Sequence, residues 1–205
     1  MSVKGLIFDC DGTLVDTLPI YRSAYRKILA PYKSSIAEDW FEARKGISAA
    51  MTIQSFAEEE GLNLDIQQML KALHDNFVEG LKNLDELTAI ATIVRQYYKK
   101  IPMAVASSGL RHFVVPSLQR VELFQYFDCL VTVEEVKHPK PAPDIFIESA
   151  KRIGVHPSDC LVFEDSAEGM EAAHHANMIA VDATRLIKGK HLLPIEEIQP
   201  NHIYI

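Results

Sequence analysis

Apolar and polar residues follow two different patterns along the chain. The first apolar run, Leu6–Phe8, is short and continuous, which is typical of a strand buried on both faces. From residue 17 to residue 83, apolar residues instead recur at helical spacing, and no strand pattern interrupts them. The sequence therefore predicts one strand followed by a small helical bundle that is inserted into the main fold.

The inserted bundle is expected to contain four helices. In the first of them, Ile20, Ala24, Ile28 and Leu29 fit one helical face, and Pro31 ends the helix. The predicted helices are Pro19–Ala30, Ile36–Arg44, Ser48–Glu60 and Ile66–Leu81. Because this bundle interrupts the chain after its first strand, it is a candidate cap domain.

From residue 84 onward, predicted helices alternate with short apolar strands. The helices are Asp85–Lys99, Leu110–Val121, Asp144–Ile153 and Ala167–Ala176, and the strands are Pro102–Ala106, Cys129–Val133, Cys160–Phe163 and Ile179–Val181. Strands separated by helices of this length imply right-handed crossovers and a doubly wound parallel sheet of the α/β class. Residues 1–16 and 84–205 are expected to form this core, and residues 17–83 the helical cap. The tail from Leu192 to Ile205 could hold a short helix and a last edge strand.

The composition is typical of a globular protein that buries its own core. The chain has 205 residues, of which 48% are hydrophobic and 24% charged. Cys10, Cys129 and Cys160 are too scattered for a disulfide framework or a zinc site, so we expect reduced core cysteines. The first strand begins near the N-terminus, and no apolar run approaches the ~20 residues that a membrane helix needs. A cytoplasmic protein without membrane contact is therefore expected.

The net charge of −7 indicates what kind of partner the chain binds. It lacks the basic surface expected of a nucleic-acid-binding protein, so we expect no nucleic-acid partner. An anionic small molecule would need local positive charge from a metal ion, a few lysines or helix N-termini. The oligomeric state is left open by the sequence.

Polar side chains follow four of the predicted strands. They are Asp9 and Asp11, then Ser107-Ser108-Gly109, then Lys140, and then Glu164-Asp165. In a doubly wound sheet, the carboxyl ends of the strands line the ligand crevice. Asp9 and Asp11 are two residues apart and would face one pocket in an extended chain, with Cys10 facing away. Two close carboxylates repel each other unless a cation or hydrogen-bond donors offset their charge.

Several of these motifs also have a purely structural interpretation. Ser107-Ser108-Gly109 could cradle a phosphate or simply cap a helix. Lys140 lies in a proline-rich segment that could aim it into the site or leave it in solvent, and Asp165 could cap the next helix. Four acids at one site nevertheless call for a divalent cation as well as Lys140, and oxygen ligands favour Mg²⁺ over zinc.

The stretch from Asp9 to Thr17 resembles the signature of the haloacid dehalogenase superfamily, Asp-x-Asp-Gly-Thr followed by two hydrophobic residues and Asp. The later motifs are similar to those of its β-phosphoglucomutase-like branch, which includes phosphatases of fructose 1-phosphate and similar sugar phosphates. This resemblance implies a Mg²⁺-dependent phosphomonoester hydrolase that acts on a small sugar phosphate. Asp9 would be the nucleophile that forms an aspartyl-phosphate, and Asp11 the general acid and then base.

The resemblance also implies roles for the remaining residues. Phosphate contacts are expected from Ser107, Ser108 and Lys140, and metal contacts from Asp9, Asp11, Glu164 and Asp165. In the cap, the cations Arg44 and Lys45 precede Gly46 and are expected to contact the substrate. The alternative is a solvated helix C-terminus whose dipole favours cations.

Four other functions compete with this interpretation. A β-phosphoglucomutase-type mutase has an arginine after the cap turn Lys-Gly-x-Ser, where this chain has Ala49. A dehalogenase does not need Asp11, because it attacks carbon rather than phosphorus. A phosphonate hydrolase would need a cap lysine as a Schiff base, for which Lys45 is the candidate. An inactive binding module is disfavoured by the intact set of acids. The physiological substrate is left open.

Overall fold

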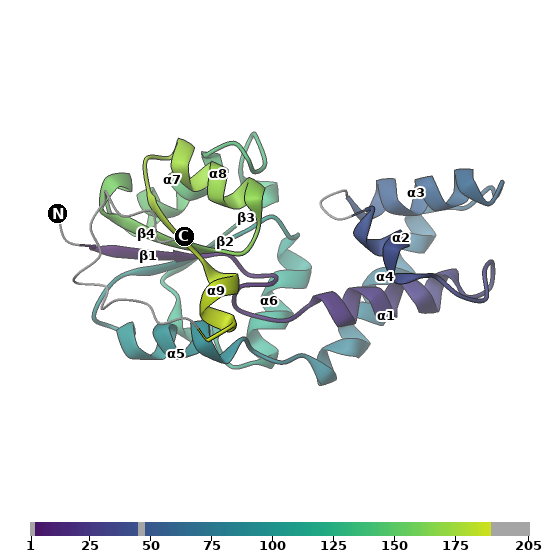
Figure 1. The fold of residues 1–205 in the computed structure, drawn as a ribbon, viewed down its shortest axis with the longest axis horizontal. Coiled ribbons are helices and arrows are strands. Elements are labelled where there is room, and N and C mark those ends of the chain that lie inside the picture. Colours follow the sequence, from purple (N-terminus) through teal and green to yellow (C-terminus); the bar gives the residue numbers. More distant parts are fainter. Residues whose placement is uncertain (1–2, 45–47, 190–205) are drawn as a thin grey trace. The chain divides into compact units, whose positions relative to one another are not determined.

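The computed structural model describes residues 3–44 and 48–189. The chain divides into two compact units, Met1–Thr17 with Leu84–Ile205, and Leu18–Asn83 (Figure 1). Thr17, which we expected in the helical insertion, groups with the first unit, and its hydroxyl donates a hydrogen bond to the Asp11 carboxylate at 2.6 Å. The helix and strand predicted in the C-terminal tail lie outside the described residues.

The first unit contains a parallel sheet of five strands within the described residues. The strands are β1 (Gly5–Phe8), β2 (Met103–Ser107), β3 (Cys129–Thr132), β4 (Cys160–Glu164) and β5 (Ile179–Asp182). Their order is β3-β2-β1-β4-β5, and every neighbouring pair is parallel. This arrangement confirms the predicted doubly wound parallel sheet. The strand order reverses at β1, so the crevice for ligands lies beyond the carboxyl end of this central strand.

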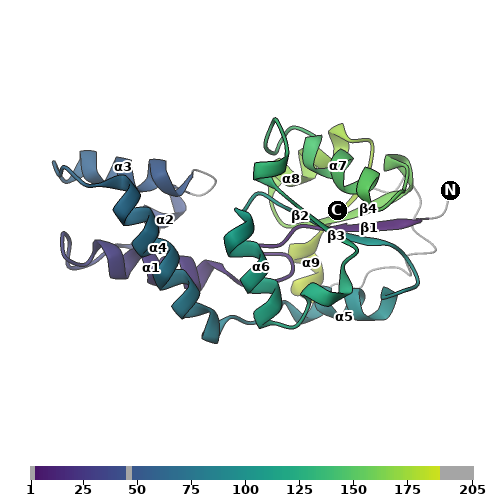
Figure 2. The same ribbon diagram turned by 180° about the vertical axis from the view of Figure 1, so that it is seen from behind.

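Helices cover both faces of the sheet, which explains why its strands are uninterrupted apolar runs. Helices α7 (Asp144–Arg152) and α8 (Ala167–His175) lie on one face, and α5 (Thr88–Tyr97) and α9 (Ala183–Ile187) on the other (Figures 1 and 2). Helix α6 (Arg111–Arg120) follows β2. Four short 3₁₀ helices lie in the connections of the described chain, at Leu81–Asn83, Phe124–Tyr126, Val133–Glu135 and Pro157–Asp159. Phe8 of β1 stacks on Phe163 of β4 with ring centroids 4.8 Å apart, which fixes the pairing of these two strands.

Helix α5 begins three residues later than the predicted start at Asp85. The reason is that the preceding segment pairs with the chain that follows β1. The Asp16 N–H donates to the Asp85 carbonyl at 3.1 Å, and the Leu87 N–H donates to the Leu14 carbonyl at 2.9 Å. Backbone groups of Asp85 and Leu87 therefore form hydrogen bonds with a neighbouring segment, and the helix begins only after them.

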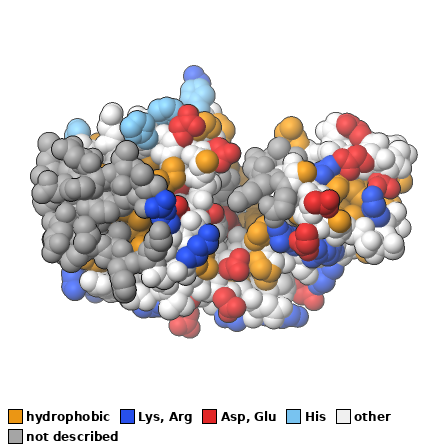
Figure 3. Space-filling view, viewed as in Figure 1, with side chains coloured by type: hydrophobic (Ala, Val, Ile, Leu, Met, Phe, Trp, Pro, Cys, Tyr) orange, Lys and Arg blue, Asp and Glu red, His pale blue; other side chains and the backbone are white. Residues whose placement is uncertain are grey.

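The second unit is a helical bundle. Its helices are α1 (Leu18–Leu29), α2 (Glu38–Glu42), α3 (Ala49–Glu59) and α4 (Ile66–Gly80). Leu29, Phe56 and Phe77 are fully buried, so the apolar faces of α1, α3 and α4 form its core. On the visible surface of this unit, acidic and basic side chains are interspersed (Figure 3), and pairs such as Lys27–Glu79 join neighbouring helices.

Helix α2 is shorter than the predicted segment Ile36–Arg44. Ala37 has an extended backbone, with φ −72° and ψ 157°, so the helix begins only at Glu38. None of the helices in the described part of the chain is long and apolar enough to cross a membrane.

Candidate active site

Asp9 directly follows β1, and its carboxylate lies at the carboxyl end of the sheet. The Asp9 N–H donates to the Phe163 carbonyl at 2.9 Å, which holds this residue between β1 and β4. Its side chain is only 8% exposed, and Oδ1 accepts a hydrogen bond from Lys140 Nζ at 2.6 Å. Burial raises the pKa of Asp9 well above its usual range, and the nearby Glu164 carboxylate raises it further, while Lys140 lowers it. Asp9 is therefore an acid that depends on neighbouring positive charge to stay ionised.

The turn after Asp9 needs a glycine for two independent reasons. Gly12 has φ +87°, a left-handed conformation that side chains with a Cβ rarely adopt. A Cβ at this position would also lie 2.4 Å from Asp165 Oδ2, so the glycine allows the turn to approach that carboxylate. The Gly12 N–H donates to the Val15 carbonyl at 2.8 Å, which closes the turn. The same turn places the Thr13 hydroxyl 3.4 Å from Asp165 Oδ1.

Asp11 is held next to the end of β2. Its Oδ1 accepts a hydrogen bond from the Thr17 hydroxyl at 2.6 Å. Burial raises the pKa of Asp11, despite hydrogen bonds from Thr17 and Ser107 and the charge of Lys140, which all lower it. The structure thus brings Asp11 and Ser107 together, as the sequence predicts for residues at neighbouring strand ends.

The Ser107-Ser108-Gly109 motif forms a tight turn between β2 and α6. Ser107 is fully buried, and its Oγ accepts the Gly109 N–H at 3.0 Å. A Cβ on Gly109 would lie 3.2 Å from both Ser107 Oγ and Asp11 Oδ2, so this glycine also allows a close approach. Ser108 is exposed beside the turn, and α6 begins two residues after Gly109, at Arg111. A hydroxyl group and a helix N-terminus therefore lie beside Asp11, an arrangement suited to an anion.

Lys140 reaches the site from the segment between β3 and α7. Its side chain is 5% exposed, and Nζ donates to Asp9 Oδ1 at 2.6 Å, to Glu164 Oε2 at 2.7 Å and to the Ala106 carbonyl at 3.1 Å. These three acceptors match the three donors of an ammonium group. Burial lowers the pKa of Lys140, but the two carboxylates raise it by more, so the net shift is upward. Lys140 is therefore a permanently charged partner of Asp9.

Glu164 ties this lysine to the turn before α8. Its Oε1 accepts hydrogen bonds from the backbone N–H groups of Asp165 at 3.1 Å and Ser166 at 3.0 Å, and from the Ser166 hydroxyl at 2.8 Å. Its Oε2 faces Lys140, and the residue is 1% exposed. A Cβ on Gly169 would lie 2.0 Å from Glu164 Cδ, so α8 passes directly over the carboxylate. These contacts position Lys140 and orient the Glu164 carboxylate.

Three of the four acids predicted as metal ligands form a cluster in the described structure. Asp9, Glu164 and Asp165 each offer a carboxylate oxygen, and these oxygens lie within 4.8 Å of one another. Asp11 does not belong to this cluster, because its side chain is turned toward Thr17 and Ser107. One lysine cannot balance the three carboxylates, and the donor atoms are all hard oxygens. The cluster therefore fits Mg²⁺.

Arg44, predicted to contact the substrate, makes extensive contacts within the helical unit. Its guanidinium lies 4.0 Å from the centre of the Trp40 ring and forms an ion pair with Glu59. It also donates to the Trp40 carbonyl at 3.0 Å and to Ser55 Oγ at 3.2 Å, and its side chain is 12% exposed. These contacts indicate a role in holding α2 against α3 and give no support to a substrate contact. Lys45 and Gly46 lie outside the described residues.

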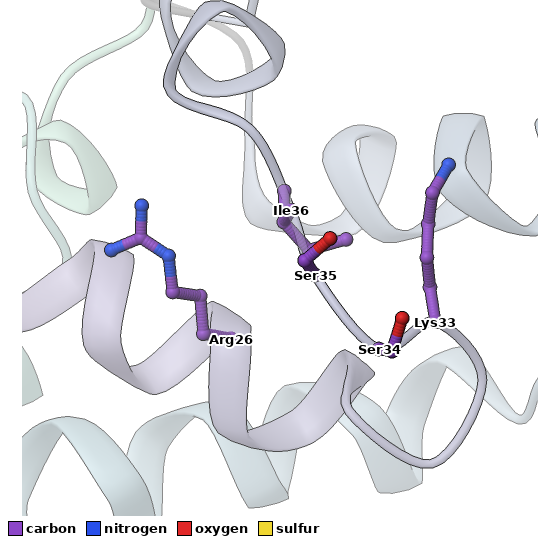
Figure 4. Close-up of a pocket in the computed structure, with 5 residues that line it drawn as sticks. All are labelled: Arg26, Lys33, Ser34, Ser35 and Ile36. Carbon is purple, nitrogen blue, oxygen red and sulfur yellow. The ribbon is translucent and has the colours of Figure 1, made fainter.

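A pocket of about 180 Å³ in the helical unit does not form a second anion site. It is lined by Arg26, Lys33, Ser34, Ser35 and Ile36 (Figure 4). The Lys33 side chain points away from Arg26, so the two cations do not converge. Arg26 is paired with Glu38, and Lys33 with Glu60, which neutralises both charges.

Two threonines that orient acids of the site were not predicted from the sequence. Thr17 donates to Asp11, and Thr13 donates to Asp165. Thr13 lies within the Asp-x-Asp-Gly-Thr signature, so its place in the motif was a usable signal. Nothing in the local pattern pointed to the hydrogen bond from Thr17.

Known proteins of one family resemble this chain in sequence and in fold. The sequence profile of the family described as haloacid dehalogenase-like hydrolase matches residues 6–183, a range that includes all the core site residues above. Fructose-1-phosphate phosphatase YqaB of Escherichia coli is 35% identical over 182 residues, which are 89% of this chain and 97% of that protein. Phosphorylated carbohydrates phosphatase of Thermotoga maritima is 31% identical over 180 residues, with coverage of 86% and 82%. The crystal structure of β-phosphoglucomutase from Clostridium difficile is 25% identical, with a TM-score of 0.73 and coverage of 87% and 83%.

Proposed function

Since the chain belongs to the haloacid dehalogenase-like hydrolase family, we propose that it is a Mg²⁺-dependent phosphatase that hydrolyses a small phosphorylated sugar, with fructose 1-phosphate as the leading candidate. One observation carries this proposal. The buried Asp9 carboxylate accepts a hydrogen bond from Lys140 and lies close to carboxylate oxygens of Glu164 and Asp165. In the proposed reaction, Asp9 attacks phosphorus, the sugar leaves, and water hydrolyses the resulting aspartyl-phosphate.

Lys140 prepares Asp9 for attack. Its hydrogen bond to Oδ1 fixes the orientation of the carboxylate, and its charge lowers the pKa of Asp9 and so favours the ionised form. Asp9, Glu164 and Asp165 would hold the metal, which when bound supplies positive charge that offsets the acids and the phosphoryl oxygens. Ser107 and Ser108, at the N-terminal end of α6, would contact the phosphate.

Asp11 is proposed to protonate the leaving oxygen and then to deprotonate the attacking water. A general acid must hold a proton near neutral pH, and burial raises the pKa of Asp11 in that direction. The Thr17 hydroxyl fixes the carboxylate through Oδ1. Thr17 is also the last residue of the first unit before the helical unit begins at Leu18.

We further propose that the helical unit is a cap that selects the sugar. The α/β core carries all the acids of the proposed site, and these are proposed to act on the phosphate group. Discrimination between sugars would then come from other groups, which contact the sugar itself. Lys45 remains a candidate for such a contact. The substrate is proposed to be a small molecule in the cytoplasm, and the net charge of −7 argues against a nucleic-acid substrate.

Phosphate release from a panel of phosphomonoesters tests the proposed function. We expect hydrolysis of p-nitrophenyl phosphate, and a kcat/KM for fructose 1-phosphate or a related sugar phosphate that is at least ~10-fold higher, because contacts with the sugar add binding energy. Absence of phosphate release from every ester would refute the phosphatase. A uniform rate across the panel would refute selection of a sugar.

A mutase is the second candidate, favoured by the similarity to the β-phosphoglucomutase structure. That enzyme type needs a grip on a second phosphate, and the position after Ser48 is Ala49 at the start of α3. Alanine offers no charge to a phosphate. Conversion of β-glucose 1-phosphate to glucose 6-phosphate in the presence of a bisphosphate would establish the mutase instead.

Activity is expected to require Mg²⁺ and to stop when excess EDTA is added. Ca²⁺ takes more ligands at longer distances, so it should hold the acids in a looser geometry and support less than ~10% of the rate. The rate of p-nitrophenyl phosphate hydrolysis should return when Mg²⁺ is restored, which controls for unfolding in EDTA. Full activity in EDTA would exclude the metal.

A further inference from the structure

The segment that carries Lys140 is held in place by contacts to α7 and α8. Residues 136–143 form neither helix nor strand, so Lys140 points wherever this backbone aims it. The His138 N–H donates to Asp144 Oδ1 at 3.2 Å, and the His138 ring Nδ1 lies 3.0 Å from the same oxygen, which closes the segment onto the first turn of α7. The Pro141 carbonyl lies 3.1 Å from Nδ1 of His175, the last residue of α8. Figure 3 shows histidine side chains on the surface over these two helices.

We propose that His175 is a positioning residue that fixes the Lys140 segment against α8. A carbonyl oxygen only accepts hydrogen bonds, so Nδ1 must carry the proton in this contact. The other end of α8 is tied to the acids of the site, because Ser166 Oγ accepts the Gly169 N–H at 3.0 Å and donates to Glu164 Oε1 at 2.8 Å. One helix thus connects the backbone beside Lys140 to the carboxylate that the Lys140 ammonium must meet.

This arrangement explains how a lysine on an irregular segment can make two short contacts to buried carboxylates. A lysine side chain has many rotamers, and three acceptors select one of them only if the backbone is placed correctly. The bond from His175 fixes the carbonyl of Pro141, the residue that follows Lys140. Its loss should let the segment shift and weaken the contact between Nζ and Asp9.

The inference rests on the proposed function, because its effect is measured as phosphatase activity. His175 is half-exposed and lies outside the proposed binding machinery. Its loss should lower kcat, because Lys140 contacts the nucleophile, and should change KM by less than about twofold. A single neutral hydrogen bond sets a ceiling of about tenfold on this effect.

Three variants test the inference with p-nitrophenyl phosphate and Mg²⁺. His175→Ala should lower kcat about threefold to tenfold without lowering the melting temperature, since alanine favours the helix. His175→Asn should retain the wild-type kcat, because its side-chain amide can place an N–H near the position of Nδ1. His174→Ala, at the exposed neighbouring position of α8, is the matched control and should also retain it.

Wild-type kcat in His175→Ala would overturn the inference. So would an equal loss in His175→Asn or in His174→Ala, because the effect would then not depend on the donated hydrogen bond. The wild-type protein separates this result from the proposed function. An inactive wild type refutes the phosphatase itself, whereas an active wild type with a fully active His175→Ala refutes only the role of His175.

Discussion

Asp9→Asn is expected to lower kcat by at least ~10³, which corresponds to about 4 kcal/mol of transition-state stabilisation. The amide is a poor nucleophile, and it also removes one carboxylate from the cluster with Glu164 and Asp165. Its effect on folding should be smaller than that of losing Lys140, because burial and Glu164 disfavour the charged form of Asp9 and the lysine keeps Glu164 as a partner. Single-turnover rates together with a thermal melt would separate lost chemistry from lost structure.

Asp65→Asn provides a matched control for this change. Asp65 caps α4 by accepting the Gln68 N–H at 3.1 Å, and asparagine caps helices equally well. This variant should keep both the melting temperature and kcat. Substantial hydrolysis by a folded Asp9→Asn protein would contradict the covalent mechanism and leave the acids with only an electrostatic role.

The sheet could be predicted from the sequence because its strands are buried on both faces and form continuous apolar runs. The residues at which the strands end could not be predicted in the same way. Ser107 and Glu164 are the last residues of β2 and β4, although a polar residue normally indicates that a strand has ended. Both are buried, and their polarity is satisfied by partners that are distant in the sequence or that lie in the turns that follow. A local pattern contains no information about such partners.

The same limit applies to the candidate site. The acids and Lys140 could be named because they follow predicted strands, and parallel strands bring their carboxyl ends together. The hydrogen-bond partners that orient the acids could not be predicted, because contacts such as Thr17 with Asp11 and Ser166 with Glu164 are not encoded in a local pattern.

Arg44 is a residue for which the sequence allowed two roles, and its contact with the substrate stays a prediction. A cation at a predicted helix end resembles a ligand contact, but Trp40 lies four residues earlier, at the spacing of one helical turn. An arginine at this distance from a tryptophan can stack on its ring. That signal was present in the sequence and favours packing within the bundle.

Lys140→Met is expected to cost both activity and stability. The side chain is 5% exposed and contacts Asp9 and Glu164, so its loss leaves two buried carboxylates without their cation. Breaking a buried ion pair in this way typically costs about 3–5 kcal/mol. For a domain of this size, the melting temperature in EDTA should fall by roughly 10 °C. The kcat should fall at least ~10²-fold, because the developing charge on the phosphoryl group loses a fixed cation.

A second substitution separates these two losses. Glu164→Gln in the Lys140→Met background removes one of the two uncompensated charges, so it should recover part of the lost melting temperature. It should recover no activity, since the cation beside Asp9 is still missing. A Lys140→Met protein as stable as the wild type in EDTA would contradict the buried ion pair. A double variant less stable than Lys140→Met would show that Glu164 stabilises the fold mainly through its three hydrogen bonds to the 165–166 turn, and not through its pairing with the lysine.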